Sequence, residues 1–246
     1  MITSFTIKES CVLFDSSFIP PELLKIIMAK HNSGTAISVN GLKKSFGENP
    51  VIWDLNLELE WGKFLALFGT NGSGKTTLLK ILASQIQADS GQIIISGYDQ
   101  AKNPRAIRRN IGVVGHQHYL YDDLTCAENL QFYGRLYNLS QISKRINSVL
   151  SRVDLEQYSG WKVRSLSHGM QKRLALGRAI LHEPAILLLD EPEGGLDQRS
   201  LGILHDISSE WTSSMRSIIM TTHNHDLGNR WSDNIGILSN GILRTD

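Results

Sequence analysis

The chain has 246 residues, with 25 Lys and Arg against 24 Asp and Glu and a formal net charge of +1. This length predicts one large domain, or a domain with a smaller lobe, and 41% apolar residues exclude a disordered or fibrous chain. The near-balance of charge argues against a nucleic-acid-binding surface, which normally shows a basic excess. No apolar run is long enough for a membrane helix, so we expect a chain that does not cross a bilayer by itself.

Residues 1–34 differ in character from the rest. Pro20 and Pro21 precede a short apolar stretch, and because proline suits the start of a helix, a short amphipathic helix is predicted over 21–30. The segment lacks the apolar core of a secretory signal and the arginines of a mitochondrial one. Either these residues are a genuine appendage, ordered or disordered, or translation starts at Met28. A separate domain is expected over 35–246.

From about residue 35 the pattern is that of an α/β protein. A half-buried strand is predicted over 51–60, where three polar residues alternate with the apolar residues Val51, Leu55, Leu57 and Leu59. The short, continuously apolar segments 64–68, 186–189 and 218–220 are typical of strands covered on both faces. A further strand is expected over 92–95.

Helical spacing of apolar residues predicts helices over 76–86 and 170–181, and two helices within 126–156. Asn240-Gly241, between two apolar pairs, is a strong hairpin signal. Strands that alternate with helices predict an α/β fold, in which helices wrap a parallel sheet.

Residues 69–76 read Gly-Thr-Asn-Gly-Ser-Gly-Lys-Thr and fit the phosphate-loop pattern G-x-x-x-x-G-K-[ST] at every fixed position. The glycines let backbone N–H groups converge on a phosphate chain, and the following helix adds its positive end. Lys75 supplies charge for the β- and γ-phosphates, and the Thr76 hydroxyl suits Mg²⁺. The predicted nucleoside triphosphate site comprises Gly69, Thr70, Asn71, Gly72, Ser73, Gly74, Lys75, Thr76 and Thr77.

Asp190 and Glu191 directly follow the buried strand 186–189. A carboxylate at the end of such a strand can act at Mg²⁺, which is the role expected of Asp190. Glu191, one residue further on, can polarise a water for attack on the γ-phosphate. A strand that ends in two acidic residues is common, so the prediction depends on the phosphate loop that accompanies it.

A third motif, Leu166-Ser167-His168-Gly169-Met170, precedes the helix predicted over 170–181. It resembles the Leu-Ser-Gly-Gly-Gln signature of ATP-binding cassette (ABC) ATPases, with His168 and Met170 in place of two family residues. The resemblance implies that this signature closes over the ATP held by a second copy of the chain. Two ATP molecules would then lie between the subunits of a head-to-tail dimer.

Further positions match the family in chain order. Phe46 resembles the aromatic residue that stacks on adenine, and Gln117 resembles the glutamine that contacts Mg²⁺ and the attacking water. Asp197 resembles a loop aspartate that communicates across the dimer, and His223 the histidine that holds the γ-phosphate and Glu191. The resemblance thus implies ATP and Mg²⁺ as cofactors, with the metal ligands Thr76, Gln117 and Asp190.

The resemblance covers about 37–246. It implies a RecA-like P-loop sheet with an antiparallel β edge and an inserted helical subdomain at about 118–165. The family also implies a transport ATPase, held at the cytoplasmic face of a membrane by an integral membrane subunit that contacts about 116–138.

Within the family, the chain is most similar to the heme-exporter ATP-binding protein of cytochrome c biogenesis, on residues 114–117, 128–133 and 166–173. Drug and polysaccharide exporters share some of these features. A soluble ABC ATPase of iron–sulfur cluster assembly is a further alternative, whereas a DNA-repair ATPase would need a long coiled coil that this sequence lacks.

Overall fold

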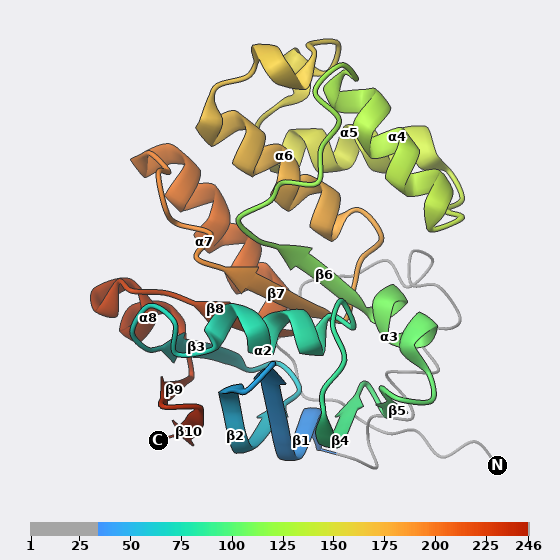
Figure 1. Ribbon diagram of the computed structural model, residues 1–246. Coiled ribbons are helices and arrows are strands. Elements are labelled where there is room, and N and C mark those ends of the chain that lie inside the picture. Colours follow the sequence, from blue (N-terminus) through green and yellow to red (C-terminus); the bar gives the residue numbers. More distant parts are fainter. Residues whose placement is uncertain (1–33, 246) are drawn as a thin grey trace, which may run out of the picture. The chain divides into compact units, whose positions relative to one another are not determined.

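The computed structural model describes residues 34–245, whose arrangement is shown in Figure 1. The helix predicted over 21–30 lies outside the described residues. The boundaries expected for the appendage, at 1–34, and for the helical subdomain stay predictions.

Four antiparallel strands form one sheet in the order β2-β1-β4-β5. These strands are β1 (Thr35–Phe46), β2 (Asn49–Glu60), β4 (Ser90–Ile95) and β5 (Tyr98–Asp99). The strands predicted over 51–60 and 92–95 are confirmed as β2 and β4.

The side of β2 that Val51 occupies differs from the prediction. Ile52 is fully buried, whereas Val51 is only partly buried. Leu42 pairs with Leu55 and Lys44 with Ile52, so β2 carries one extra residue between the two pairs. Asp54 lies there with a φ of 55°. Because an inserted residue reverses the alternation of a strand, the apolar pattern changes side at this point.

The second sheet has six strands in the order β10-β9-β3-β8-β7-β6. The strands are β3 (Phe64–Phe68), β6 (Ile111–Val114), β7 (Ile186–Asp190), β8 (Ser217–Thr221), β9 (Asn234–Ser239) and β10 (Ile242–Thr245). All neighbours are parallel except β9 and β10, which form the predicted hairpin. Asn240 and Gly241 turn that hairpin with positive φ angles. The predicted parallel sheet with an antiparallel edge is confirmed.

The helices cover this sheet and extend beyond it (Figure 1). They are α2 (Lys75–Leu82), α3 (Pro104–Asn110), α4 (Cys126–Leu136), α5 (Ile142–Arg152), α6 (His168–Ile180), α7 (Gln198–Ser213) and α8 (His225–Trp231). The helix predicted over 76–86 ends earlier, at Leu82, since Ser84 turns the chain with a φ of 54°. No helix among residues 34–245 is both long enough and apolar enough to span a bilayer.

Alternate residues of the central strands belong to two different hydrophobic clusters. Leu65 and Leu188 point into a cluster with α2 and the antiparallel sheet. Phe64, Leu187 and Leu189 point into a second cluster with α4, α5, α6 and α7. The parallel sheet is therefore buried on both faces, which explains why its strands are continuously apolar.

Candidate nucleotide site

The phosphate loop lies between β3 and α2, where its backbone turns through the left-handed region. Gly72 and Gly74 have φ angles of 78° and 105°, which glycine adopts without the strain of a Cβ. A Cβ on Gly69 would approach the Leu238 carbonyl oxygen to 2.4 Å. Gly74 is the N-cap of α2, so the loop ends at the positive end of that helix.

Lys75 is held inside this loop. Its Nζ donates to the carbonyl oxygens of Gly69 at 2.7 Å and Thr70 at 3.2 Å. Burial lowers the pKa of Lys75, and the negative charges of Glu191 and Asp190 oppose that shift. The cation therefore lies at the phosphate loop, where its charge can attract an anionic phosphate chain.

Asp190 ends β7 as a buried carboxylate that accepts two hydroxyl hydrogen bonds. Thr76 Oγ1 donates to Asp190 Oδ2 at 2.9 Å, and Thr221 Oγ1 donates to Oδ1 at 2.7 Å. Oxygen ligands of this kind fit Mg²⁺, which usually keeps phosphate and water oxygens beside one or two protein ligands. Among residues 34–245, no three His, Cys, Asp or Glu side chains are grouped to hold a metal. Thr76 and Asp190 are the residues that would hold the ion, beside phosphate oxygens.

Thr221 is absent from the residues predicted for the site. A signal for it was available, because it directly follows the buried segment 218–220. Parallel neighbouring strands end at the same edge of a sheet, and β8 pairs with β7 so that Asp190 lies opposite Thr221. Sequence reasoning placed both strands but did not place them next to each other.

Glu191 and His223 contact each other across this edge. His223 Nε2 lies 2.7 Å from Glu191 Oε1, and the same nitrogen lies 3.4 Å from Lys75 Nζ. The Glu191 backbone has a φ of 50°, and its N–H is donated to the Thr221 hydroxyl at 3.0 Å. The structure thus brings together three side chains that are widely separated in the sequence.

Gln117 lies near these groups without bonding to them. It lines a cleft of about 200 Å³ together with Thr76 and Asp190, and within the described part of the chain no hydrogen bond joins it to either. His116 lies closer, with Nε2 3.6 Å from Asp190 Oδ2. The sequence prediction did not include His116 in the site.

Phe46 lies at the end of β1, and the signature motif lies at the start of α6. Phe46 ends β1 with 51% of its surface exposed, and Lys44 Nζ lies over its ring at 5.3 Å. Ser167 caps α6 by accepting the Met170 N–H at 3.3 Å. Over residues 34–245, no hydrogen bond or ion pair joins Leu166–Met170 to the phosphate loop.

Asp197 caps the next helix, α7, by accepting the Ser200 N–H at 2.8 Å. Hydrogen bonds from Ser200 lower the pKa of Asp197 most, and the charges of Arg173 and Arg199 add to the shift. Asp197 therefore stays an exposed anion at the start of α7.

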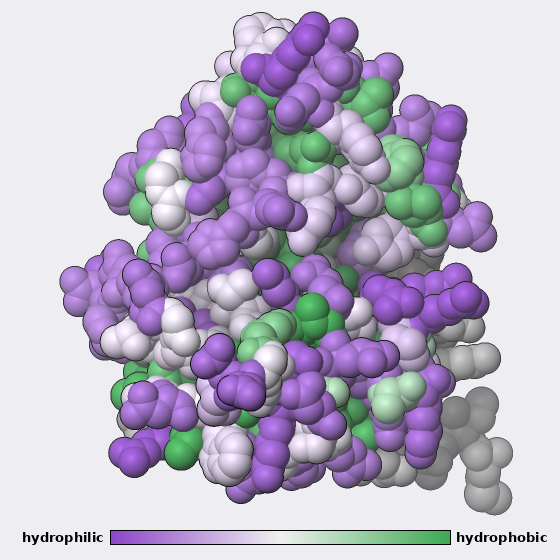
Figure 2. Space-filling model, in the orientation of Figure 1, coloured by the Kyte–Doolittle hydropathy of each residue, from purple (hydrophilic) through white to green (hydrophobic). Residues whose placement is uncertain are grey.

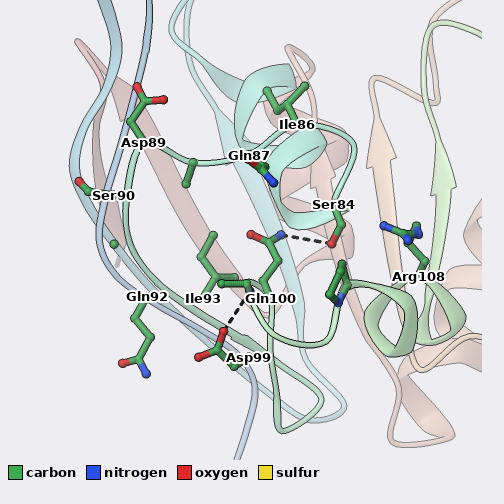
Figure 3. A pocket seen from close by; sticks show the side chains of 14 residues that line it. Ser84, Ile86, Gln87, Asp89, Ser90, Gln92, Ile93, Asp99, Gln100 and Arg108 are labelled. Atoms are coloured by element: carbon green, nitrogen blue, oxygen red, sulfur yellow. Dashed lines mark hydrogen bonds between the residues drawn. The ribbon is translucent and has the colours of Figure 1, made fainter.

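A larger cleft lies away from all of these residues (Figure 3). It encloses about 490 Å³ between the end of α2, β4 and α3, and its lining includes Gln100 and Arg108. Gln100 Nε2 donates to Ser84 Oγ at 3.4 Å across it. None of the predicted site residues lines this cleft.

Comparisons with known proteins identify relatives of this chain. A family model described as ABC transporter matches residues 52–194. NatA of Bacillus subtilis (strain 168), an ABC transporter ATP-binding protein, is 36% identical over 173 residues, which are 69% of this chain and 70% of NatA.

Two further relatives have names that refer to export or drug resistance. Nod factor export ATP-binding protein I of Ralstonia nicotianae is 34% identical over 83% of this chain and 64% of that protein. Daunorubicin resistance ATP-binding protein DrrA3 of Streptomyces coeruleorubidus is 32% identical over 84% of this chain and 66% of that protein. The chain thus spans about two thirds of the length of these relatives. They do not support the heme-exporter assignment suggested by the sequence.

Solved structures share the fold. The structure of an ATP-binding subunit of an ABC transporter has a TM-score of 0.81 at 28% identity, covering 86% of this chain and 90% of the other. The dimeric post-hydrolysis structure of the ATP-binding cassette MJ0796, bound to ADP and Pi, has a TM-score of 0.78 at 26% identity, covering 85% of this chain and 97% of the other. Since the family model matches more than half of the chain and these structures share its fold, the chain belongs to the ABC transporter family and carries its ATP-hydrolysing domain.

Proposed function

We propose that this chain is the ATP-hydrolysing subunit of an ABC exporter whose substrate is a small molecule of the drug or Nod factor kind. The observation that carries the ATPase part is the convergence of Lys75, Glu191 and His223 beside the phosphate loop. The names of the relatives support the export part, and they favour drug export over heme export.

The phosphate loop and Lys75 bind the β- and γ-phosphates of ATP. Thr76 and Asp190 would hold Mg²⁺, with Gln117 approaching from the adjacent cleft. When bound, the ion neutralises phosphate charge. Thr221 fixes the Asp190 carboxylate through its hydroxyl, so this ligand is oriented before the nucleotide arrives.

Glu191 takes the proton from the attacking water. Its partner, His223, holds the carboxylate through the 2.7 Å contact. This contact directs the carboxylate toward the γ-phosphate that Lys75 binds. In phosphoryl transfer, positioning and charge stabilisation supply most of the catalysis. A base held between a histidine and the phosphate loop meets both requirements.

A second copy of the chain completes the site. The signature residues Leu166–Met170 and the exposed anion Asp197 lie at the starts of α6 and α7, away from this chain's own phosphate loop. In a head-to-tail dimer these residues would face the ATP of the partner. Phe46 would stack on adenine. The dimeric structure of MJ0796 supports this assembly.

A membrane subunit would dock beside α4. Large hydrophobic side chains are exposed on this helix and on the loop before it, namely Tyr119, Tyr121, Phe132 and Leu136, and Figure 2 shows hydrophobic surface over α4. A cleft of about 240 Å³ lies next to them, lined by Tyr133, Tyr137 and Arg178. Such a surface suits an apolar helix of a partner and would place the chain at the cytoplasmic face of a membrane.

The test is Glu191→Gln. We expect this variant to bind Mg-ATP with unchanged affinity, to lose nearly all turnover, and to form a dimer that depends on ATP. Lys75→Ala, which removes the phosphate-loop cation, is the control and is expected to lose binding itself. Normal hydrolysis by Glu191→Gln would exclude Glu191 as the base.

Export is tested in cells with the same variant. Replacing Glu191 by Gln in the chromosomal gene is expected to raise the intracellular accumulation of doxorubicin, used as the probe. Unchanged accumulation of this probe would contradict the drug class of substrate and leave the ATPase part standing.

A further inference from the structure

Asp154 joins three helices at one carboxylate oxygen. It follows α5, and its Oδ2 accepts a hydrogen bond from Arg173 Nη1 of α6 at 2.8 Å and forms an ion pair with Arg199 Nη2 of α7 at 2.7 Å. Arg173 Nη1 also donates to the Asp154 and Val153 carbonyl oxygens, at 2.9 Å and 3.1 Å. We call Asp154, Arg173 and Arg199 the Asp154 junction. Arginine keeps its charge at neutral pH, so the contacts of both arginines with the carboxylate are charge-assisted.

The Asp154 junction lies next to the starts of α6 and α7, which carry the residues proposed to face the partner. Arg173 is in the second turn of α6, which begins after Ser167, and Arg199 is the second residue of α7, which Asp197 caps. The two starts also lie close together, because a Cβ on Gly169 would be 3.9 Å from Ser200 Oγ. The junction therefore links the elements that present the signature and Asp197.

The backbone at Asp154 does not need an aspartate. Its φ is 55°, in the left-handed region just beyond the end of α5. Glycine is the residue that occupies this position after a helix with least strain. The side chain, 35% exposed, is thus not required for the turn or for filling the core, which leaves the contacts with the two arginines as its contribution.

We propose that Asp154 is a positioning residue that holds the starts of α6 and α7 as one rigid surface, so that the signature and Asp197 engage the partner's ATP together. This inference depends on the proposed ATP-bound dimer. Without the carboxylate Arg199 loses its link to Arg173, so the two helix starts are held together less rigidly, and ordering both at once makes closure of the dimer less favourable. Nucleotide binding to the subunit's own phosphate loop does not involve the junction.

The experiment combines Asp154→Gly and Asp154→Asn, each with and without Glu191→Gln. With Glu191 intact, we expect the maximal rate to fall at least about fivefold, the lower end of coupling between sites. With Glu191→Gln, the ATP concentration for half-maximal dimerisation is expected to rise by a similar factor. The ADP affinity of the Asp154→Gly monomer and its thermal midpoint should stay unchanged. A residue with a merely structural role would lower the thermal midpoint together with the rate.

Two comparisons sharpen the result. Glu210→Gln breaks the Arg152–Glu210 pair, which also joins α5 to α7 at 2.8 Å but near the far end of α7, and it should change neither rate nor dimerisation. The double variant Asp154→Asn with Arg199→Gln should lose no more of the maximal rate than the worse of the two single variants, because the effects of residues that act through one contact are not additive.

Three outcomes would each overturn the inference. Asp154→Gly could have the same maximal rate as the parent, Glu210→Gln could lose as much rate as Asp154→Gly, or the losses in the double variant could be additive. Failure of Glu191→Gln to dimerise with Asp154 intact would instead contradict the proposed function.

Discussion

At the scale of single residues, the Thr221 hydroxyl bonds to both acidic residues of the site, to the carboxylate of Asp190 and to the backbone of Glu191. It donates to Asp190 Oδ1 at 2.7 Å and accepts the Glu191 N–H at 3.0 Å. Thr221 is fully buried, so no solvent can replace either hydrogen bond. One hydroxyl thus orients the carboxylate of the proposed Mg²⁺ ligand and, together with the Thr221 carbonyl oxygen, holds the backbone of the proposed base.

Thr221→Val keeps the shape and removes both hydrogen bonds. The Glu191 N–H keeps its hydrogen bond to the Thr221 carbonyl oxygen, whereas buried Asp190 Oδ1 loses its partner. We therefore expect a loss of about 1–3 kcal/mol in the free energy of unfolding, the cost of one unpaired buried polar group, together with slower ATP turnover. Urea unfolding and steady-state hydrolysis measure the two effects. Thr212→Val, whose hydroxyl bonds only to carbonyl oxygens of its own helix, is the control, and a turnover loss of equal size there would refute the argument.

At the scale of elements, α4 and α5 begin in contrasting ways. Thr125 and Glu128 form a capping box at α4, with the Thr125 N–H donated to Glu128 Oε2 at 2.8 Å. This hydrogen bond lowers the pKa of Glu128. Gln141, at the start of α5, has a φ of 51° and no side-chain cap. Of these two helices, therefore, only α4 is stabilised by a side chain of the residue before it.

Thr125→Ala is expected to lower the free energy of unfolding by about 1 kcal/mol. Gln141→Gly should instead raise it, because a side chain in the left-handed region costs about 1–2 kcal/mol, and the greater backbone entropy of glycine in the unfolded chain offsets only about 0.5–1 kcal/mol of that gain. Because the folded pKa of Glu128 is lowered, its contribution is present above the unfolded pKa and disappears as the pH falls. The difference between parent and Glu128→Ala, which removes the carboxylate that accepts the Thr125 N–H, should therefore shrink in acid, and urea midpoints across pH measure it. A difference that grew in acid would contradict the capping box.

At the scale of the whole molecule, the candidate site is a seam between distant parts of the chain. Its groups come from the loop after β3, the end of β7, and the loop after β8. A ligand that binds all three parts stabilises the folded state only, since the unfolded chain has no such site. Nucleotide binding should therefore be visible as resistance to unfolding.

For Glu191→Gln, saturating Mg-ATP is expected to raise the thermal midpoint. At a ligand concentration of 100 times Kd, the gain in stability is about 2.7 kcal/mol. Differential scanning fluorimetry with and without Mg-ATP measures the shift, and Lys75→Ala should show none. Equal shifts in both variants would mean that the phosphate loop does not hold the nucleotide.

Local patterns predicted much of the fold. The phosphate loop, the buried strands 64–68, 186–189 and 218–220, and the hairpin at Asn240-Gly241 each depend on neighbouring residues, so the sequence alone could identify them. The prediction did not include β1, β6 or α7. β1 carries Gly41 at a φ of 61° and several register shifts, which interrupt the alternation that marks a strand.

The sequence by itself determined that this protein binds a nucleoside triphosphate, because a phosphate loop is a contiguous backbone structure whose residues carry their own geometry. Only the tertiary structure decided which polar groups meet there. Strand order placed Thr221 beside Asp190 and His223 beside Glu191, and helix packing brought Asp154 to Arg173 and Arg199. Contacts of this kind join residues far apart in the chain, and no spacing in the sequence encodes them.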